Sequence, residues 1–338
     1  MPDPMPPTFM PTVSAIIPTW NREDLVESIL ANLSAQTRPP EHIIIVDNGS
    51  KDRSAEIARR SGAEVIAFAQ NRGFAAAVNA GIERSSGEWV LILNNDVRLE
   101  PHWLERLLAS AQHEHAAFAV GKLLQADDAQ TLDGSWDLLS RGAYAWRCGW
   151  GRPDEGVWRA RRKIRLAPMT AVLFHRRVFD QLGLLETRFE SYYEDVDFGV
   201  RCALAGFEGV YEPEAVAFHA GKATLGKNGA RVMYLSARNQ VLLLAKHYPA
   251  RTLRRFAWPI FVGQMLALAT TAKHGHLLAG MRGKLEGLYK WRDFRNDLQP
   301  ATLIEAAVSE SESEIRELQK MIGFDIYWRL YFKLVRPA

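Results

Sequence analysis

The chain has 338 residues, of which 47% are hydrophobic and 24% charged, an ordinary composition for a globular protein with a sizeable core. Its 42 Lys and Arg against 39 Asp and Glu leave a net charge of only +3, so the total charge says little about partners. The two cysteines form neither a CxxC pair nor a Cys/His ligand spacing, which argues against structural zinc and favours a reducing compartment.

The N-terminus carries five prolines between residues 2 and 11, and we expect a flexible arm over residues 1–11. It shows no basic leader followed by an apolar segment, so a secretory signal is not expected. Together with the cysteine pattern, this favours a cytoplasmic protein.

Strand-like and helix-like segments alternate over the next part of the chain. The apolar runs that predict strands are Val13–Ile17, His42–Val46, Glu64–Phe68 and Trp89–Leu93. This alternation predicts an α/β fold, with a mostly parallel, Rossmann-like central sheet covered by helices on both faces. Ligands of such sheets bind beyond the carboxyl ends of the strands, which is where we expect a site.

Further elements follow Pro101. They are a helix over Trp103–Gln112, strands over Phe118–Leu124 and Met169–Phe174, a helix over Asp195–Ala205 and a hairpin or strand pair over Val210–Phe218. The Gly/Trp/Arg-rich stretch Ala126–Arg165 has weak periodicity and is expected to be a functional or disordered loop. Beyond Arg231 the pattern is helical. We place a soft boundary near Ala245, between a sheet domain over residues 12–245 and a helical, basic and aromatic region over residues 246–338.

Each of the first four predicted strands is followed by polar residues suited to binding a nucleotide. These segments are Pro18-Thr19-Trp20-Asn21-Arg22, Asp47-Asn48-Gly49-Ser50, Asn71-Arg72-Gly73 and Asn94-Asn95-Asp96. Asp47 is a candidate acceptor for a base N–H or a ribose hydroxyl, and Arg72 a candidate donor to a phosphate oxygen. The alternative is that all are turn and N-cap residues, because Asn, Asp, Ser and Gly dominate both. Four such clusters at one sheet edge favour a binding site.

The order and spacing of these segments resemble the family-two glycosyltransferases of the GT-A fold, in particular their rhamnosyltransferase-like branch. The resemblance runs from Val13 to about Thr224 and also rests on Asn79-Ala80-Gly81, Glu194-Asp195-Val196-Asp197 and His219-Ala220-Gly221-Lys222-Ala223-Thr224. It implies a GT-A catalytic domain that binds a nucleoside-diphosphate sugar. The residues that it assigns to this donor are Pro18, Thr19, Asn21, Asp47, Asn48, Ser50, Asn71, Arg72, Gly73, Asn79, Asn94 and Asn95.

The resemblance also implies a divalent cation, Mn²⁺ or Mg²⁺, that neutralises the leaving diphosphate. In the resembled family the cation sits at an Asp-x-Asp motif, which here reads Asn94-Asn95-Asp96. Asp96 is therefore the implied metal ligand and His219 the second, while Asn94 offers an amide oxygen, a water-mediated contact or a ribose contact. The alternatives are that Asp96 caps a helix starting near Pro101 and that His219 is a hydrogen-bonded residue near the core.

Three carboxylates lie in the segment Glu194-Asp195-Val196-Asp197, at the start of a predicted helix whose dipole stabilises negative charge. The resemblance implies that Asp195 is the general base, with direct attack on the anomeric carbon and inversion of configuration. Glu194 and Asp197 are then expected to orient the acceptor or a loop. The alternative is that acids in a first helical turn only stabilise the helix.

The stretch from Trp136 to Arg165 suggests an acceptor site. It contains Trp136, Trp146, Trp150 and Trp158, with eight Arg or Lys residues between Arg141 and Arg165. Tryptophan rings stack on sugars and arginines bind phosphates, which favours a glycan or polyprenyl-diphosphate-linked acceptor, with Trp150 among its contacts. A nucleic-acid partner would suit the same composition, but no nucleic-acid-binding motif is present and none is expected.

The segment Phe256–Ala272 is uncharged over 17 residues and is flanked by Arg254-Arg255 and Lys273. It is an interfacial helix at the cytoplasmic face of a membrane, a buried helix or homodimer contact, or a membrane span, although a span usually needs about 20 apolar residues. Basic and aromatic flanks, Trp291, Arg292, Phe294 and Arg295, favour peripheral membrane contact. Ile322–Val335 repeats this character, with packing on the catalytic domain or a second copy as the alternative.

Other classes fit the motifs less well. A sugar nucleotidyltransferase would need a Gly-rich phosphate loop after the first strand, and a dehydrogenase would need GxGxxG after Ile17. A membrane-embedded synthase would carry Gln-x-x-Arg-Trp, to which the nearest segment is Ser236-Ala237-Arg238-Asn239-Gln240. A non-catalytic sugar- or membrane-binding subunit stays open because the metal motif lacks its first Asp. Rhamnose from a dTDP donor is implied by the branch, whereas Asp47 suits UDP equally because uracil and thymine share an imide edge.

Overall fold

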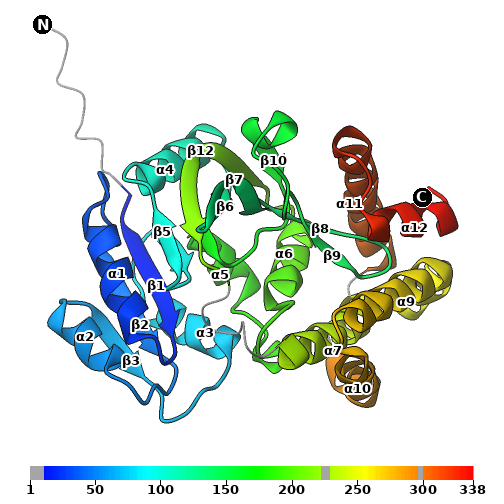
Figure 1. Ribbon diagram of the computed structural model, residues 1–338, viewed down its shortest axis with the longest axis horizontal. Helices are drawn as coiled ribbons and strands as arrows, with labels where there is room; N and C mark the ends of the chain where they lie inside the picture. Colours follow the sequence, from blue (N-terminus) through cyan, green and yellow to red (C-terminus); the bar gives the residue numbers. More distant parts are fainter. Residues whose placement is uncertain (1–10, 222–228, 296–299, 338) are drawn as a thin grey trace, which may run out of the picture.

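The centre of the protein is a ten-stranded mixed sheet (Figure 1). The computed structural model describes residues 11–221, 229–295 and 300–337. Parallel strands form one half of the sheet in the order β3-β2-β1-β4. These are β1 (Val13–Thr19), β2 (His42–Asp47), β3 (Glu64–Ala67) and β4 (Trp89–Leu93), which confirms the four predicted strands. Of the predicted N-terminal arm, only Pro11 lies within the described residues.

The other half of the sheet is mixed. β11 (Ala171–His175) runs antiparallel between β4 and β6 (Phe118–Gln125), and β12 (Gly209–His219) pairs parallel with β6. Three further strands pair antiparallel with this half. β5 (Val97–Leu99) and β10 (Arg162–Ile164) pair with β12, and β7 (Asp128–Gly134) pairs with β6. The predicted hairpin at Val210–Phe218 is wrong, because β12 is one strand whose pairing with β6 shifts between Glu212 and Val216.

The stretch expected to be a loop, Ala126–Arg165, is largely ordered into short elements. Besides β7 and β10 it contains a separate two-stranded sheet of β8 (Asp137–Leu139) and β9 (Ala145–Arg147), and a 3₁₀ turn over Gly156–Arg159. The expectation of a loop is therefore wrong for most of this stretch. Strands of three residues are too short to show periodicity in the sequence.

Helices cover both faces of the sheet, as predicted. Alternate residues of β1 point to opposite faces, so Ala15 and Ile17 enter one hydrophobic cluster and Ile16 the other. The first face is covered by α1 (Glu23–Ser34), α2 (Ser54–Arg60) and α4 (Trp103–His113). The second is covered by α3 (Phe74–Arg84), α5 (Arg177–Leu182) and α6 (Glu194–Leu204). Together with the predominant strand direction, this confirms the predicted GT-A type of fold.

The C-terminal helices gather on one side of the sheet (Figure 1). They are α7 (Gly229–His247), α8 (Ala250–Arg255), α9 (Ala257–Lys273), α10 (Leu277–Tyr289), α11 (Ala301–Ile322) and α12 (Ile326–Leu334). The boundary predicted near Ala245 falls inside α7. Val262 of α9, Ile315 of α11 and Trp328 of α12 share a hydrophobic cluster with β1.

The two segments considered for membrane contact differ in their packing. None of the helices within the described ranges, α9 included, is long and apolar enough to cross a membrane. In α12, Trp328 and Tyr331 are buried, and the ring of Tyr327 stacks on Tyr144 with 4.0 Å between centroids. Phe294, one of the expected interfacial aromatics, is also buried.

The arginines expected to bind phosphate are instead paired with acids. Arg141 and Glu312 form a buried pair at 2.6 Å, and Arg162 lies 2.5 Å from Glu314. Arg165 pairs with Glu310, and Arg152 with Asp325. Three of these acids belong to α11 and Asp325 directly precedes α12, so the C-terminal region neutralises these arginines. This corrects the phosphate-binding expectation for all four.

We expect Glu312→Ala to lower the free energy of unfolding by about 3–5 kcal/mol, because it leaves the Arg141 charge buried without a partner. Glu312 also accepts hydrogen bonds from the Arg141 backbone N–H and the Tyr331 hydroxyl. The matched control is Glu310→Ala, which removes an exposed pair and should cost about 1 kcal/mol or less. Urea unfolding measures both, and equal effects would contradict this packing.

Candidate active site

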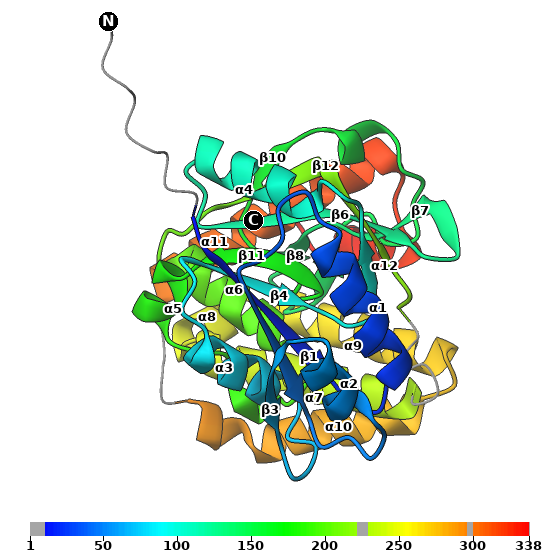
Figure 2. The same cartoon turned by 90° about the vertical axis from the view of Figure 1, so that its left-hand side faces the viewer.

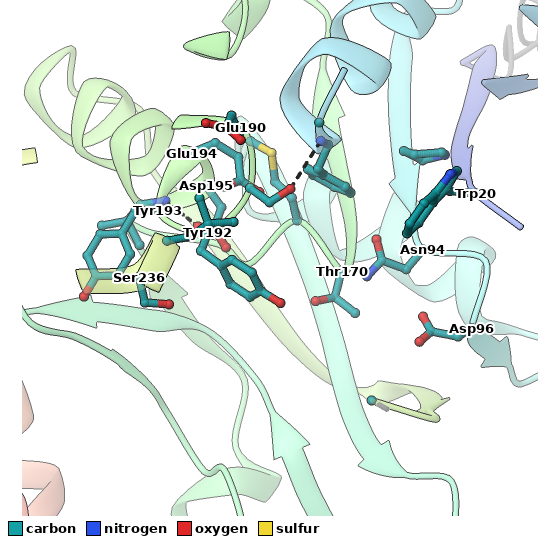
Figure 3. A pocket seen from close by; sticks show the side chains of 18 of the residues that line it. Trp20, Asn94, Asp96, Thr170, Glu190, Tyr192, Tyr193, Glu194, Asp195 and Ser236 are labelled. Atoms are coloured by element: carbon teal, nitrogen blue, oxygen red, sulfur yellow. Dashed lines mark hydrogen bonds between the residues drawn. The ribbon is translucent and has the colours of Figure 1, made fainter. Parts of the chain in front are cut away.

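A cavity of ≈ 1180 Å³ opens at the carboxyl ends of β1 and β4. Pockets for one small ligand usually have about 300–1,000 Å³, so this cavity has room for two substrates. Figure 3 shows its two walls, with Trp20, Asn94 and Asp96 on one side and Tyr192, Glu194 and Asp195 on the other. The position matches the edge of the sheet at which the sequence predicts a ligand.

The first wall contains most of the residues expected to bind the donor. Those that line the cavity are Pro18, Thr19, Asn48, Asn71, Arg72, Gly73, Asn94 and Asn95. Their side chains link neighbouring strand ends. Asn48 donates to the Gly73 carbonyl oxygen over 3.0 Å and accepts from the Arg72 N–H over 2.8 Å. Asn95 donates to the Thr19 hydroxyl over 2.9 Å.

Asn21, Asp47 and Ser50 lie outside the residues that line the cavity. Asp47 is buried and accepts the Ser50 N–H over 3.0 Å, while the Ser50 hydroxyl accepts the Asn21 N–H over 2.9 Å. These bonds are those of turn residues, the alternative that the sequence left open.

The assignment of Asn79 to the nucleotide is corrected, because Asn79 lies outside the residues that line the cavity. It is buried in α3, donates to the Leu185 carbonyl oxygen over 2.8 Å and accepts the Leu185 N–H over 2.9 Å. It ties α3 to the segment that leads to α6.

Asp96 and His219 meet at the floor of the cavity. His219 Nε2 lies 3.2 Å from an Asp96 carboxylate oxygen, and Nδ1 lies 2.7 Å from an oxygen of Asp133. Burial alone would lower the pKa of His219, but hydrogen bonds to Asp133 and Asp96 outweigh it and raise the pKa to about 9. Helix α4 begins after His102 with no side-chain cap, so Asp96 does not cap it. The two carboxylates create a place that favours positive charge.

The donor atoms of Asp96 and His219 fit a divalent cation. A carboxylate oxygen suits Mn²⁺ or Mg²⁺, and an imidazole nitrogen suits Mn²⁺ better than Mg²⁺ once the cation has displaced its proton. Among the described residues there is no group of three or more His, Cys, Asp or Glu side chains that could hold a metal. A bound diphosphate and water are suited to supply further ligands for a cation at this pair.

Asp195 stands on the opposite wall, in the first turn of α6. One carboxylate oxygen accepts the Val196 N–H over 2.8 Å, and the other lies 3.6 Å from Arg147. Arg147 also contacts Asp137 over 3.3 Å. Burial raises the pKa of Asp137 to about 6, although Arg147 opposes the shift. Arg147 and Asp137 lie in the stretch from Ala126 to Arg165, where the sequence gives no periodic signal.

Glu194 and Asp197 differ in their position relative to the cavity. Glu194 lines the cavity, and burial followed by the charge of Asp195 raises its pKa well above the usual range. Asp197 is fully buried away from the cavity and accepts hydrogen bonds from Arg201, Lys246 and His247. The expectation that Asp197 contacts an acceptor is therefore wrong. Its carboxylate ties α6 to α7.

The turn before α6 is strained. Glu190, Tyr192 and Tyr193 have φ angles of 64°, 68° and 69°, a region that side chains other than glycine rarely adopt. The fully buried Asn239 of α7 places its amide nitrogen 2.9, 3.0 and 2.6 Å from the carbonyl oxygens of Phe189, Ser191 and Tyr192. Its neighbour Arg238 contacts the Glu190 carboxylate over 2.6 Å.

The same turn contacts the first wall, which we call the donor wall because it contains the residues expected to bind the donor. The Glu190 carbonyl oxygen accepts the Ala75 N–H over 3.2 Å, and a Cβ on Gly73 would lie 2.9 Å from that oxygen. Gly73 also has φ 89°, so a side chain there would be strained as well as crowded. Residues 190–193 therefore set the distance between the two walls.

Of the four tryptophans expected to contact an acceptor, only Trp150 is exposed. Trp136, Trp146 and Trp158 are buried, and the ring of Trp136 packs on Trp158. Trp150 is 66% exposed and lines the cavity. The acceptor expectation is thus corrected for the three buried rings, and for Trp150 it stays a prediction.

Fold and site together define a GT-A type of enzyme with a donor wall, a facing acidic helix and room for two substrates. The chain belongs to glycosyl transferase family 2, whose family model matches residues 14–182. This confirms the family, the glycosyltransferase class and the fold that the sequence motifs predict.

Relatives agree with this assignment. The N-acetylglucosaminyl-diphospho-decaprenol L-rhamnosyltransferase of Mycobacterium tuberculosis is 28% identical over 254 residues, 68% of this chain and 83% of that one. The mannosyltransferase PcManGT of Pyrobaculum calidifontis, solved with GDP-Man and Mn²⁺, has a TM-score of 0.52 at 18% identity and covers 91% of this chain and 89% of that one. GalNAc-T7, solved with UDP, GalNAc and Mn²⁺, has a TM-score of 0.61 at 13% identity, over 90% and 58% of the two chains. At such identities the two solved structures show the fold alone.

We expect Asn239→Asp to lower kcat on the order of a hundredfold, because exchanging the amide nitrogen for oxygen repels the three carbonyls and shifts the turn that positions Asp195. Turnover is measured as release of nucleoside diphosphate. Asn32→Asp is the matched control, since Asn32 of α1 also donates to a backbone carbonyl, that of Leu99, away from the cavity. A folded Asn239→Asp protein with the turnover of the control would contradict the positioning role.

Proposed function

We propose that the protein is an inverting, metal-assisted glycosyltransferase that moves a sugar from a dTDP- or UDP-linked donor to a glycan carried on a lipid diphosphate. The observation that carries this proposal is the placement of Asp195 across a single cavity from the Asp96–His219 pair (Figure 3). It separates a site for the departing diphosphate from a site for the attacking hydroxyl.

The donor wall would hold the nucleotide and its diphosphate. Asn48, Arg72 and Asn95 line the cavity at neighbouring strand ends, where amide and guanidinium groups can bind ribose and phosphate oxygens. A divalent cation bound by Asp96 and His219 would neutralise the negative charge that develops on the leaving diphosphate. Asp133 holds the His219 ring in place through the hydrogen bond to Nδ1.

The opposite wall, which carries Asp195 and which we call the acceptor wall, would supply the base. The Asp195 carboxylate takes the proton of the acceptor hydroxyl while the hydroxyl oxygen forms a bond to the anomeric carbon. The bond from that carbon to the diphosphate oxygen breaks, and the nucleoside diphosphate leaves with the electron pair. Attack from the face opposite the leaving group inverts the configuration. Glu194 is less suited to act as the base, because burial and the charge of Asp195 raise its pKa and so favour its protonated form.

The choice of sugar and acceptor is supported by the Mycobacterium tuberculosis relative, whose name gives an L-rhamnosyl transfer to a decaprenol-diphosphate-linked sugar. Rhamnose is accordingly the first candidate sugar. An acceptor on a lipid would require peripheral contact with the cytoplasmic face of a membrane, and exposed Trp150 at the cavity is suited to stacking on the acceptor glycan.

We expect Asp195→Asn to abolish transfer and to leave nucleotide binding nearly unchanged, since the amide keeps the shape of the side chain but cannot accept the proton. Release of nucleoside diphosphate with acceptor present measures transfer, and calorimetric titration with the nucleotide measures binding. Asp127→Asn, at an exposed position, is the control. Unchanged turnover would refute the base. A wild-type protein that binds the sugar nucleotide but never releases diphosphate would instead support a non-catalytic binding subunit.

A further inference from the structure

Large apolar side chains project outward from the hairpin of α9 and α10. In α9 they recur at a spacing of three and four residues, and in α10 Leu278, Met281, Leu285 and Tyr289 do the same, so each helix presents most of them on one face. They are Trp258, Phe261 and Met265 in α9 and Leu277, Leu278, Met281, Leu285, Leu288 and Tyr289 in α10. Leu278 is 81% exposed and Tyr289 87%, values usual for charged side chains. We call these nine residues the hairpin face.

The inner side of α10 explains why the large residues lie outside. Gly280, Gly283 and Gly287 are buried against neighbouring helices. A Cβ on Gly283 would lie 2.2 Å from the Tyr234 carbonyl oxygen of α7, so only glycine permits this approach. Helix α10 therefore buries its smallest residues and exposes its largest, the reverse of an ordinary surface helix. Large exposed apolar side chains that gather on neighbouring helices mark a binding surface.

Positive charge surrounds the hairpin face. Residues 250–295 contain nine Lys and Arg against two acids, Glu286 and Asp293, and Glu286 already pairs with Lys290. The exposed cations with no ion pair among the described residues are Arg251, Arg254, Lys273, Arg282 and Arg292. A second copy of the chain would bring this positive rim against itself. An anionic surface matches it, and a bilayer supplies both the anionic headgroups and an apolar layer beneath them.

The hairpin lies next to the wall of the cavity. Leu235 and Ser236 of α7 line the cavity, while Tyr234 and Val241 of the same helix contact α10. Figures 1 and 2 both show α10 running alongside α7, on the outside of the molecule. A membrane held at the hairpin face would therefore be one helix away from the acceptor wall. This consequence rests on the proposed function, whereas the binding surface itself does not.

We propose that the hairpin face is a docking surface for an anionic lipid bilayer. Its leucines, methionines and aromatic rings insert among the acyl chains at the interface, and the surrounding arginines and lysines contact the headgroups. Of the alternatives for Phe256–Ala272, this proposal takes the interfacial helix. It also adds α10, which contributes more of the surface than the uncharged segment does.

The test uses the full chain and sedimentation with lipid vesicles, either phosphatidylcholine alone or phosphatidylcholine mixed with phosphatidylglycerol. We expect binding to the mixed vesicles, weakened by salt, and on the order of a tenfold or greater loss in the double variant Leu278→Glu/Leu285→Glu. Leu303→Glu is the matched control, since Leu303 is an exposed leucine of α11 outside the hairpin face, and it should bind like the wild type.

Two results would overturn the proposal. One is equal sedimentation of the wild type and the double variant with the mixed vesicles. The other is a wild-type dimer in sedimentation velocity that the double variant abolishes, without vesicle binding, which would assign the face to a second copy of the chain. Release of nucleoside diphosphate with a soluble acceptor is measured in parallel. It should be the same in both proteins, so failure of docking is distinguishable from failure of the proposed function.

Discussion

The strained turn at residues 190–193 is the constraint on which the site depends. Three residues other than glycine adopt positive φ angles there, and such conformations persist only when the surroundings fix them. Asn239 and Arg238 of α7 provide that fixation from one side, and the start of α3 provides it from the other. The turn thereby joins the donor wall, the acidic start of α6 and the C-terminal helices into one rigid frame, and the cavity exists because the frame holds its two walls apart.

Ion pairs help to hold the same frame together. The basic stretch after β7 meets the acidic α11, so charges that are far apart in the sequence cancel in the fold and fasten the C-terminal region to the sheet. The cations of the α9–α10 hairpin have few such partners and stay at the surface. At the cavity, acids gather at the start of α6 and in the Asp96–His219–Asp133 cluster, where the proposed function places a proton and a cation.

The sequence predicts what is local and misses what depends on distant contacts. Nearly continuous burial along β1 and β4 is visible as apolar runs. Asn94-Asn95-Asp96 and Glu194-Asp195 are visible because they directly follow or begin regular elements. Asp133, Arg147 and Asn239 are placed at the site by contacts with partners between 47 and 86 residues away, and no local sequence pattern predicts these contacts. Asp197 shows the opposite error, in which a local pattern suggests a role that the fold does not give. It lies two residues from Asp195 in the sequence, but its side chain contacts α7 and not the cavity.

The proposed function requires that a cation held by Asp96 and His219 faces Asp195 across a cavity that binds the donor. A crystal structure with Mn²⁺ and a nucleoside diphosphate, with anomalous scattering recorded at the manganese edge, would locate both ligands. We expect one anomalous peak in contact with the Asp96 carboxylate and His219 Nε2, with the nucleotide along β1 and β4, and no peak in Asp96→Ala. Manganese bound elsewhere, or a nucleotide outside the cavity, would contradict it.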